Sequence, residues 1–146
     1  MEKIIVDTRE QKPLWTHNIT RKKLDEGDYN TEKLINKIAI ERKTLQDLYG
    51  SIIQQHKRFK NEINRAIQKN KKFYLIIQGT RQDFITKNFP GGYYLKLKTP
   101  ILAKILTTIE KQNYIQFYWC KNTKEMRNTV KKIIQTETEH TQTTTQ

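Results

Sequence analysis

The feature that most constrains the fold of this chain is the apolar run Phe73–Gln78, bounded by Lys72 and Gly79. A short run of this kind, with aromatic and β-branched residues and no polar alternation, is typical of a strand buried on both faces of a sheet. Strand-like and helix-like segments alternate on either side of it. We therefore predict an α/β fold with a mixed central sheet flanked by helices.

The other elements follow from residue periodicity and from capping residues. Short β-branched or aromatic segments predict further strands at Lys3–Arg9, Leu24–Tyr29 (a turn leading into a strand, or a kink within one), Lys37–Lys43 and Ile115–Trp119. Helical spacing of apolar residues, with Thr44 and Thr99-Pro100 as starts, predicts helices over 44–70 (one kinked helix, or two, because of Gly50), 99–109 and 123–134. Residues 80–98 are expected to be rich in loops.

The C-terminal segment 135–146 differs in composition from the rest of the chain. It is nearly all Thr, Gln and Glu and has no apolar residue to bury. Such a segment cannot offset the entropy that is lost on ordering. We therefore predict one domain over residues 1–134, followed by a disordered polar tail over 135–146.

The charge of the chain predicts a polyanionic partner. The sequence contains 28 Lys and Arg against 15 Asp and Glu, a formal net charge of +13. A field of this sign attracts nucleic acid, the commonest intracellular polyanion. A charge that serves only solubility, or a lysine-rich composition inherited from an AT-rich genome, is the alternative that charge alone leaves open.

The sequence also indicates which cellular environments do not apply. No apolar run approaches the roughly 20 residues that span a bilayer, and the first residues are too short and too acidic for a secretory signal. Cys120 is the single cysteine, and the three histidines show no metal-ligand spacing. We expect a soluble, intracellular protein of the cytoplasm or nucleus, without a membrane partner.

Three residues carry the strongest chemical signal. Because strand side chains alternate, Glu41 and Lys43 share one face of the predicted strand Lys37–Lys43, and Asp28 follows a turn at Gly27. Carboxylates of this kind suit Mg²⁺ or Mn²⁺, which can activate water and neutralise a phosphate. A nearby lysine can orient water or stabilise developing charge. A solvent-facing strand and an ordinary turn would produce the same bare pattern, so it does not decide the function.

The surrounding residues extend this pattern. Ile4–Glu10 reads IIVDTRE, Gly27-Asp28-Tyr29 follows, and Glu41–Asp47 reads ERKTLQD before Arg58-Phe59-x-x-Glu62. In order and spacing over about the first 67 residues, these motifs resemble the XPF-type structure-specific endonucleases. That family is a branch of the PD-(D/E)XK, restriction-endonuclease-like nucleases. The resemblance implies the restriction-endonuclease-like version of the α/β fold.

The resemblance also implies an activity and a set of site residues. It implies a metal-dependent DNA endonuclease that cuts at branched, flapped or nicked DNA, with Mg²⁺ or Mn²⁺ as cofactor. Asp28 and Glu41 are implied to hold the metal and Lys43 to serve the water or the phosphate. Asp7 is implied to lie at the same site as a ligand or through water, and Asp47 belongs to the same catalytic motif.

Several of these residues have an equally good structural interpretation. Asp47 can cap the helix that starts after Thr44, and Arg42, on the face opposite Glu41, can form a structural ion pair. The candidate DNA-binding residues are basic side chains that a solvated surface would also present: Arg9, Arg42, Lys57 and Arg58. The aromatic segments Tyr93-Tyr94 and Phe117-Tyr118-Trp119 suit base stacking or, more commonly, a core or a dimer surface.

The partners and the competing functions remain open at this point. Full-length family members carry tandem helix-hairpin-helix motifs that bind branched DNA, and this sequence contains none, so a targeting protein is one expectation. A homodimer through the apolar faces of 101–109 and 126–134 is another, although a core needs the same faces. The alternative functions are a non-catalytic DNA-binding subunit of a nuclease complex and a basic RNA-binding scaffold. Retention of all the motif acids favours the nuclease.

Overall fold

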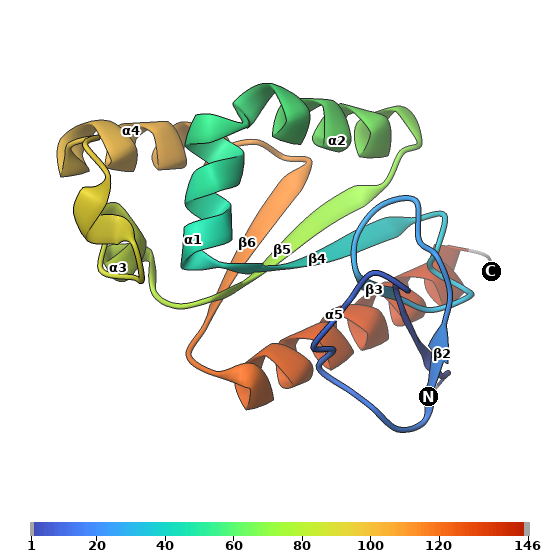
Figure 1. Cartoon of the computed structure of the whole chain (residues 1–146). Helices are drawn as coiled ribbons and strands as arrows, with labels where there is room; N and C mark the ends of the chain where they lie inside the picture. The colour runs from blue at the N-terminus through green and yellow to red at the C-terminus, as the bar shows by residue number, and fades with distance from the viewer. Residues whose placement is uncertain (1, 145–146) are drawn as a thin grey trace.

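A six-stranded mixed sheet forms the centre of the molecule, with helices on both faces (Figure 1). The structure is a computed structural model that describes residues 2–144. In spatial order the strands are β2 (Ile19–Arg21), β1 (Ile4–Val6), β3 (Tyr29–Asn30), β4 (Ile38–Thr44), β5 (Lys72–Gln78) and β6 (Ile115–Cys120). β3 runs antiparallel to β1 and β4, whereas β1–β2, β4–β5 and β5–β6 are parallel pairs. The predicted α/β class and mixed sheet are confirmed.

The helices form two layers. They are α1 (Leu45–Tyr49), the π-helical turn η1 (Gly50–Gln54), α2 (His56–Gln68), α3 (Arg81–Ile85), the 3₁₀ turn η2 (Gly92–Tyr94), α4 (Thr99–Glu110) and α5 (Thr123–Thr144). Helices α1 to α4 lie on one face of the sheet and α5 lies on the other (Figure 1). Within the described residues, no helix is long and apolar enough to cross a bilayer.

The apolar run Phe73–Gln78 forms most of the central strand β5. Phe73, Leu75 and Ile77 pack against the layer of α1, α2 and α4, whereas Tyr74 and Ile76 pack against α5. All five side chains are buried. A strand covered on both faces needs apolar residues at every position, which explains why the run shows no alternation.

The helical region after β4 is divided in two, one of the two arrangements that the sequence allowed. Thr44 caps α1, because its Oγ1 accepts a hydrogen bond from the backbone N–H of Asp47 at 3.1 Å. The π-helical turn that begins at Gly50 then separates α1 from α2. This break turns α2 across the sheet and leaves a polar hollow between the two helices and the end of β4.

The apolar faces that suited either a core or a homodimer are used mainly by the core. Leu102 and Leu106 of α4 are buried in one core cluster, and Met126 and Val130 of α5 are buried in the other. Ile101 is exposed. A homodimer therefore remains a prediction without support from these faces.

The prediction of a disordered tail from residue 135 differs from the structure. Helix α5 continues to Thr144, and the last two positions, 145 and 146, lie outside the described residues. The extension is held by a polar contact: the buried Glu137 accepts hydrogen bonds from Tyr74 Oη at 2.5 Å and Lys72 Nζ at 3.2 Å. Because this contact is polar, the pattern of apolar residues in the sequence could not predict it.

Candidate active site

Gly27 brings Asp28 against strand β4. Its φ of +81° favours glycine, and a Cβ there would lie 2.7 Å from the carbonyl oxygen of Ile40. The next residue is held on the same strand, because Asp28 N donates to Ile40 O at 2.7 Å and Asp28 Oδ2 accepts from Arg42 N at 2.8 Å. The turn therefore places Asp28 beside Glu41 and Lys43, as the sequence analysis expected.

Glu41 and Lys43 lie on the face of β4 that is covered by α1 and α2. Lys43 Nζ is 2.8 Å from Glu41 Oε2 and 5.7 Å from the centre of the Phe59 ring. The Lys43 ammonium group is thus the ion-pair partner of the buried Glu41 Oε2, which accepts no further hydrogen bond from residues 2–144. An ionised carboxylate has several lone pairs, so it can bind a further ligand beside the lysine.

A polar pocket of about 530 Å³ opens over these two residues. It is lined by residues of β4, α1, η1 and α2 and of the turn before α2: Glu41, Arg42, Lys43, Gln46, Asp47, Gly50, Ser51, Gln54, Gln55, Arg58, Phe59 and Glu62. Asp28 lies beside this pocket and does not line it. The pocket therefore brings together five of the predicted residues. Lys57, the neighbour of Arg58, does not line it.

Two carboxyl groups, Asp28 and Glu62, have raised pKa values. Burial, followed by the negative charges of Glu41 and Glu10, raises the pKa of Asp28 to about 7. Burial and a hydrogen bond with Glu41 raise the pKa of Glu62 to about 8. The protons retained by Asp28 and Glu62 therefore occupy positions where a cation would also be stabilised.

Lys43 remains a cation in this environment. Burial opposes its charge, but the charge of Glu41 and the contact with that carboxylate raise the pKa of Lys43 above its usual value. A group of this kind is a poor base and a good electrostatic partner for an anion. The geometry thus favours a role toward the phosphate for Lys43 over deprotonation of water.

Glu62 is a site residue that the sequence analysis noted in a motif without giving it a role. It lies on α2 one turn after Arg58, and both side chains line the pocket. The spacing of four residues between Arg58 and Glu62 was the sequence signal that places both on one face of a helix. Its contact with Glu41 joins positions 21 residues apart, so periodicity alone did not reveal it.

The carboxylate of Asp7, which we predicted at the metal site as a ligand or through water, accepts hydrogen bonds from protein donors. Asp7 Oδ2 accepts from Arg9 Nε at 2.8 Å, and Asp7 Oδ1 accepts from Leu24 N at 2.7 Å. Burial alone would raise the pKa of Asp7, but these donors lower it below its ordinary value. Asp7 N also donates to Asp28 O at 2.9 Å. In this arrangement Asp7 and Arg9 hold the segment that carries Asp28.

Of the remaining predicted residues, Arg42 has structural side-chain partners and Asp47 lies at the rim of the pocket. The Arg42 side chain donates to Lys12 O at 2.5 Å and lies 3.9 Å from Glu10, so it has the structural partners that its strand face suggested. Asp47 is exposed at the pocket rim, and its backbone N–H takes part in the cap of α1. Asp47 therefore both contributes to the cap of α1 and lies at the pocket.

The donor set fits a hard divalent cation. The acidic side chains at the pocket, Glu41, Asp47 and Glu62, offer carboxylate oxygens, the ligands that Mg²⁺ and Mn²⁺ prefer. Among residues 2–144, no group of three or more His, Cys, Asp or Glu side chains is arranged to hold a metal ion. Mg²⁺ is commonly bound through one or two carboxylates and keeps several waters.

These pKa shifts predict how stability depends on pH. The folded protein retains protons on Asp28 and Glu62 that the unfolded chain has already released, so the free energy of unfolding should fall as pH rises from about 5 to about 8. Thermal unfolding in EDTA measures this slope. Asp28→Asn removes one of the two groups and should flatten it. A midpoint that rises over this range, or an equal slope in the variant, would contradict the assignment.

The sheet, its helix layers and the pocket at the end of β4 together define an XPF-type nuclease domain. The chain belongs to the ERCC4 domain family, whose model matches residues 6–133. This family contains DNA structure-specific nucleases, which generally depend on divalent metal. The family resemblance in the sequence is therefore confirmed.

The fold is similar to that of known nuclease structures, including two of XPF from Aeropyrum pernix. XPF from Aeropyrum pernix in complex with DNA has a TM-score of 0.70 at 18% identity, covering 95% of this chain and 66% of that one. A second structure of XPF from Aeropyrum pernix has a TM-score of 0.64 at 18% identity, covering 93% and 61%. The chain thus spans less than two thirds of the length of these proteins. Among curated proteins, none matches its sequence.

Proposed function

We propose that this chain is a Mg²⁺- or Mn²⁺-dependent endonuclease that hydrolyses DNA phosphodiester bonds, preferentially at branched, flapped or nicked sites. The observation that carries the proposal is the position of the Glu41–Lys43 ion pair in one polar pocket, with the carboxylate of Asp28 held on the same strand by Arg42 N. An ordinary solvent-facing strand would leave these groups hydrated. Membership of the ERCC4 domain family supports the class of reaction, and the pocket supports the choice of residues.

Each group at the pocket has a role that follows from its surroundings. Asp28 and Glu41 would hold the cation, with Glu62 as a further carboxylate on the α2 side. When bound, the cation supplies an activated water and neutralises phosphate charge. Lys43, kept protonated by Glu41, is placed to stabilise the charge that develops on the phosphate oxygens.

The pocket residues are held by contacts outside the pocket. Asp7 and Arg9 fix the Leu24–Asp28 segment from one side, and the Arg42 side chain fixes β4 from the opposite face. We propose a positioning role for these three residues in place of direct metal or phosphate contact. Asp47 stands at the rim, where a carboxylate can orient an incoming water.

DNA binding is expected to depend on the basic side chains of α2. Arg58 lines the pocket, and its neighbour Lys57 is exposed beyond it. We expect Arg58→Gln to lower single-turnover cleavage by about tenfold, because a charge next to the reacting phosphate acts in the transition state. Lys57→Gln is the matched control, and it should only weaken binding and reduce the salt dependence by about one unit of slope. Equal effects of the two changes on cleavage would contradict this placement of Arg58.

The proposal is tested with end-labelled duplex, nicked, flapped and forked DNA, in EDTA and with added Mg²⁺ or Mn²⁺. The wild type should cut with either metal and not in EDTA. Asp28→Ala and Glu41→Ala should bind the same substrates without cutting them. A wild type that binds every substrate and cuts none with either metal would overturn the proposal in favour of a non-catalytic DNA-binding subunit. Substrate ranking, homodimerisation and recruitment by a targeting protein are separate proposals that this panel also informs.

A further inference from the structure

We propose that the loop of residues 86–98, here called the tyrosine loop, is a second DNA-contact site that stacks the unpaired bases of a single-stranded arm. Its contact residues are Tyr93 and Tyr94, supported by Lys96 and Lys98. This inference rests on the proposed function, because it names the part of the substrate that lies beyond the cut site.

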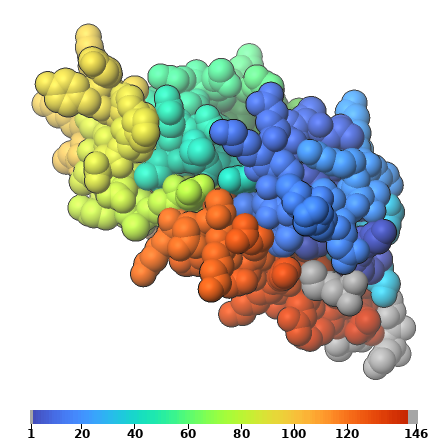
Figure 2. Space-filling view, turned by 60° about the horizontal axis from the view of Figure 1, so that its bottom comes forward, coloured from blue at the N-terminus to red at the C-terminus, as the bar shows by residue number. Residues whose placement is uncertain are grey.

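The two tyrosines are unusually open to solvent for large aromatic side chains. Tyr93 is 92% exposed and Tyr94 is 82% exposed, and their ring centres lie 5.5 Å apart with the rings nearly perpendicular. The segment that contains them, yellow in Figure 2, projects from one end of the molecule. Phe117 and Trp119, the other aromatic candidates for stacking, pack against the core instead. The structure thus separates two sets of aromatics that the sequence could not distinguish.

The base of the loop is fixed, so the exposure of the rings does not come from a loose segment. Phe89 stacks on Phe84 with ring centres 6.3 Å apart, and Lys87 Nζ donates to Leu97 O at 2.6 Å. Gly92 touches the backbone so closely that a Cβ there would lie 2.0 Å from the Lys87 carbonyl oxygen. A rigid base lowers the ordering cost when the rings bind a ligand.

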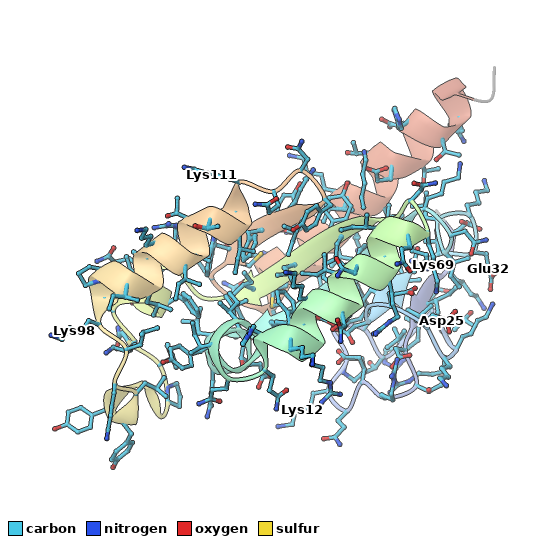
Figure 3. All side chains as sticks on the ribbon, turned by 90° about the horizontal axis from the view of Figure 1, so that it is seen from above. Lys12, Asp25, Glu32, Lys69, Lys98 and Lys111 are labelled. Carbon is cyan, nitrogen blue, oxygen red and sulfur yellow. The ribbon has the colours of Figure 1, made fainter. Side chains whose placement is uncertain are left out.

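Charge identifies the ligand class. From Phe84 to Ile109 the chain contains four lysines and no Asp or Glu: Lys87, Lys96, Lys98 and Lys104. Lys96 and Lys98 are exposed, and Figure 3 shows Lys98 at the same end of the molecule as the loop. Exposed aromatics among lysines suit the stacked bases and phosphates of a single strand. Protein interfaces are typically depleted in lysine, so this composition favours nucleic acid over a protein partner at the loop.

The tyrosine loop adjoins the active-site pocket through α1. A Cβ at Gly91 would lie 3.5 Å from Nε2 of Gln46, and Gln46 lines the pocket. Phe89 also packs on Tyr49 of the same helix, with ring centres 6.3 Å apart. A single strand that leaves the pocket past the first turns of α1 therefore meets the tyrosine loop. Within a DNA duplex the bases are already stacked on each other, so only the two terminal base pairs offer a face to these rings.

The test measures fluorescence anisotropy of a labelled oligothymidine and of a blunt duplex of equal length, in EDTA so that nothing is cut. The variants are Tyr93→Ala/Tyr94→Ala, Tyr93→Phe/Tyr94→Phe and the matched control Tyr114→Ala, which removes a partly exposed tyrosine outside the loop. The double alanine variant should bind the single strand at least about tenfold more weakly. The double phenylalanine variant and the control should bind it as the wild type does, and duplex binding should change by less than about twofold.

A second pair of changes tests the loop without touching the rings. Lys96→Gln/Lys98→Gln should lower the salt dependence of single-strand binding by about one unit of slope or slightly more. Unchanged single-strand affinity in the double alanine variant would overturn the inference. A changed oligomeric state with unchanged DNA affinity would overturn it as well, in favour of a contact between copies.

Failure of this inference can be distinguished from failure of the proposed function. If the wild type binds neither DNA, the proposed function fails together with the tyrosine loop. If the wild type binds DNA and cuts it with Mn²⁺ while the tyrosines make no difference, only the loop assignment fails.

Discussion

Replacing Glu41 with glutamine is expected to reduce DNA cleavage by at least about 1,000-fold, which corresponds to about 4 kcal/mol of transition-state stabilisation. Glutamine keeps the shape of the side chain but loses the negative charge that would hold a cation and that keeps Lys43 protonated. Glu41 Oε2 is also the buried oxygen that pairs with Lys43 Nζ at 2.8 Å. The substitution therefore affects both proposed functions of this residue.

The measurement is single-turnover cleavage of a nicked or flapped DNA with saturating Mn²⁺. DNA affinity in EDTA and thermal unfolding check that the variant still folds and binds. Glu110→Gln is a matched control, because Glu110 is paired with Arg81 at 2.9 Å on the α4 side and does not line the pocket. It should cut at the wild-type rate. Cleavage by Glu41→Gln within about tenfold of the wild type would contradict the assigned role.

Replacing Glu26 with alanine is expected to destabilise the protein by about 3–5 kcal/mol, with a fall in melting temperature on the order of 10 °C. The Glu26 side chain is 1% exposed and binds Lys69 Nζ and Lys71 Nζ, each at 2.6 Å. Lys71 is itself only 7% exposed. Removing the carboxylate therefore leaves a buried ammonium group without its partner.

Controls separate the buried pair from the exposed one. Lys69 is 46% exposed, so Lys69→Ala should destabilise the protein much less than Glu26→Ala. The double variant Glu26→Gln/Lys71→Met removes both buried charges and should recover part of the loss. A Glu26→Ala variant as stable as Lys69→Ala would contradict the account. The pair also links the start of β5 to the segment just before Gly27 and Asp28, so its loss should weaken metal binding.

The contribution of Glu26 to the free energy of unfolding changes with pH in the opposite direction to that of Asp28. Burial alone would raise the pKa of Glu26, but the hydrogen bonds from Lys69 and Lys71 lower it below its ordinary value. Its contribution to stability is therefore present above the pKa of the unfolded chain and is lost as pH falls through the lower folded value. The decline expected from Asp28 between pH 5 and 8 lies above this range, so the two effects can be measured separately.

The sequence predicted those parts of the fold that depend on local patterns. The uninterrupted run of β5, the alternation along β4 and the cap at Thr44 each follow from residues within a few positions of one another. Strand β2 was not predicted, because its side chains are largely exposed and it forms by pairing with β1. Helix α3 has only five residues and lies in a region that we expected to be loop.

The candidate site was predictable to a similar extent. The E-x-K spacing placed Glu41 and Lys43 on one face, and the glycine turn placed Asp28 beside them. Glu62 reaches Glu41 only through the packing of α2 on the sheet, so spacing did not assign its role. The carboxylate of Asp7 is directed to Arg9 and Leu24, and the Leu24 contact joins residues 17 positions apart. Its positioning role therefore required the structure.

The measurement that tests the central claim most directly is the rate of cleavage of one nicked duplex as Mn²⁺ is titrated at pH 8, for the wild type and for Asp28→Asn. The account predicts that the wild-type rate rises to saturation with Mn²⁺ and returns to zero when EDTA is added. It predicts that Asp28→Asn, which keeps the fold and the DNA affinity, cuts negligibly at the same metal concentrations. Cleavage that persists in EDTA, or an Asp28→Asn variant with the wild-type metal dependence, would contradict a metal-dependent nuclease site at Asp28 and Glu41.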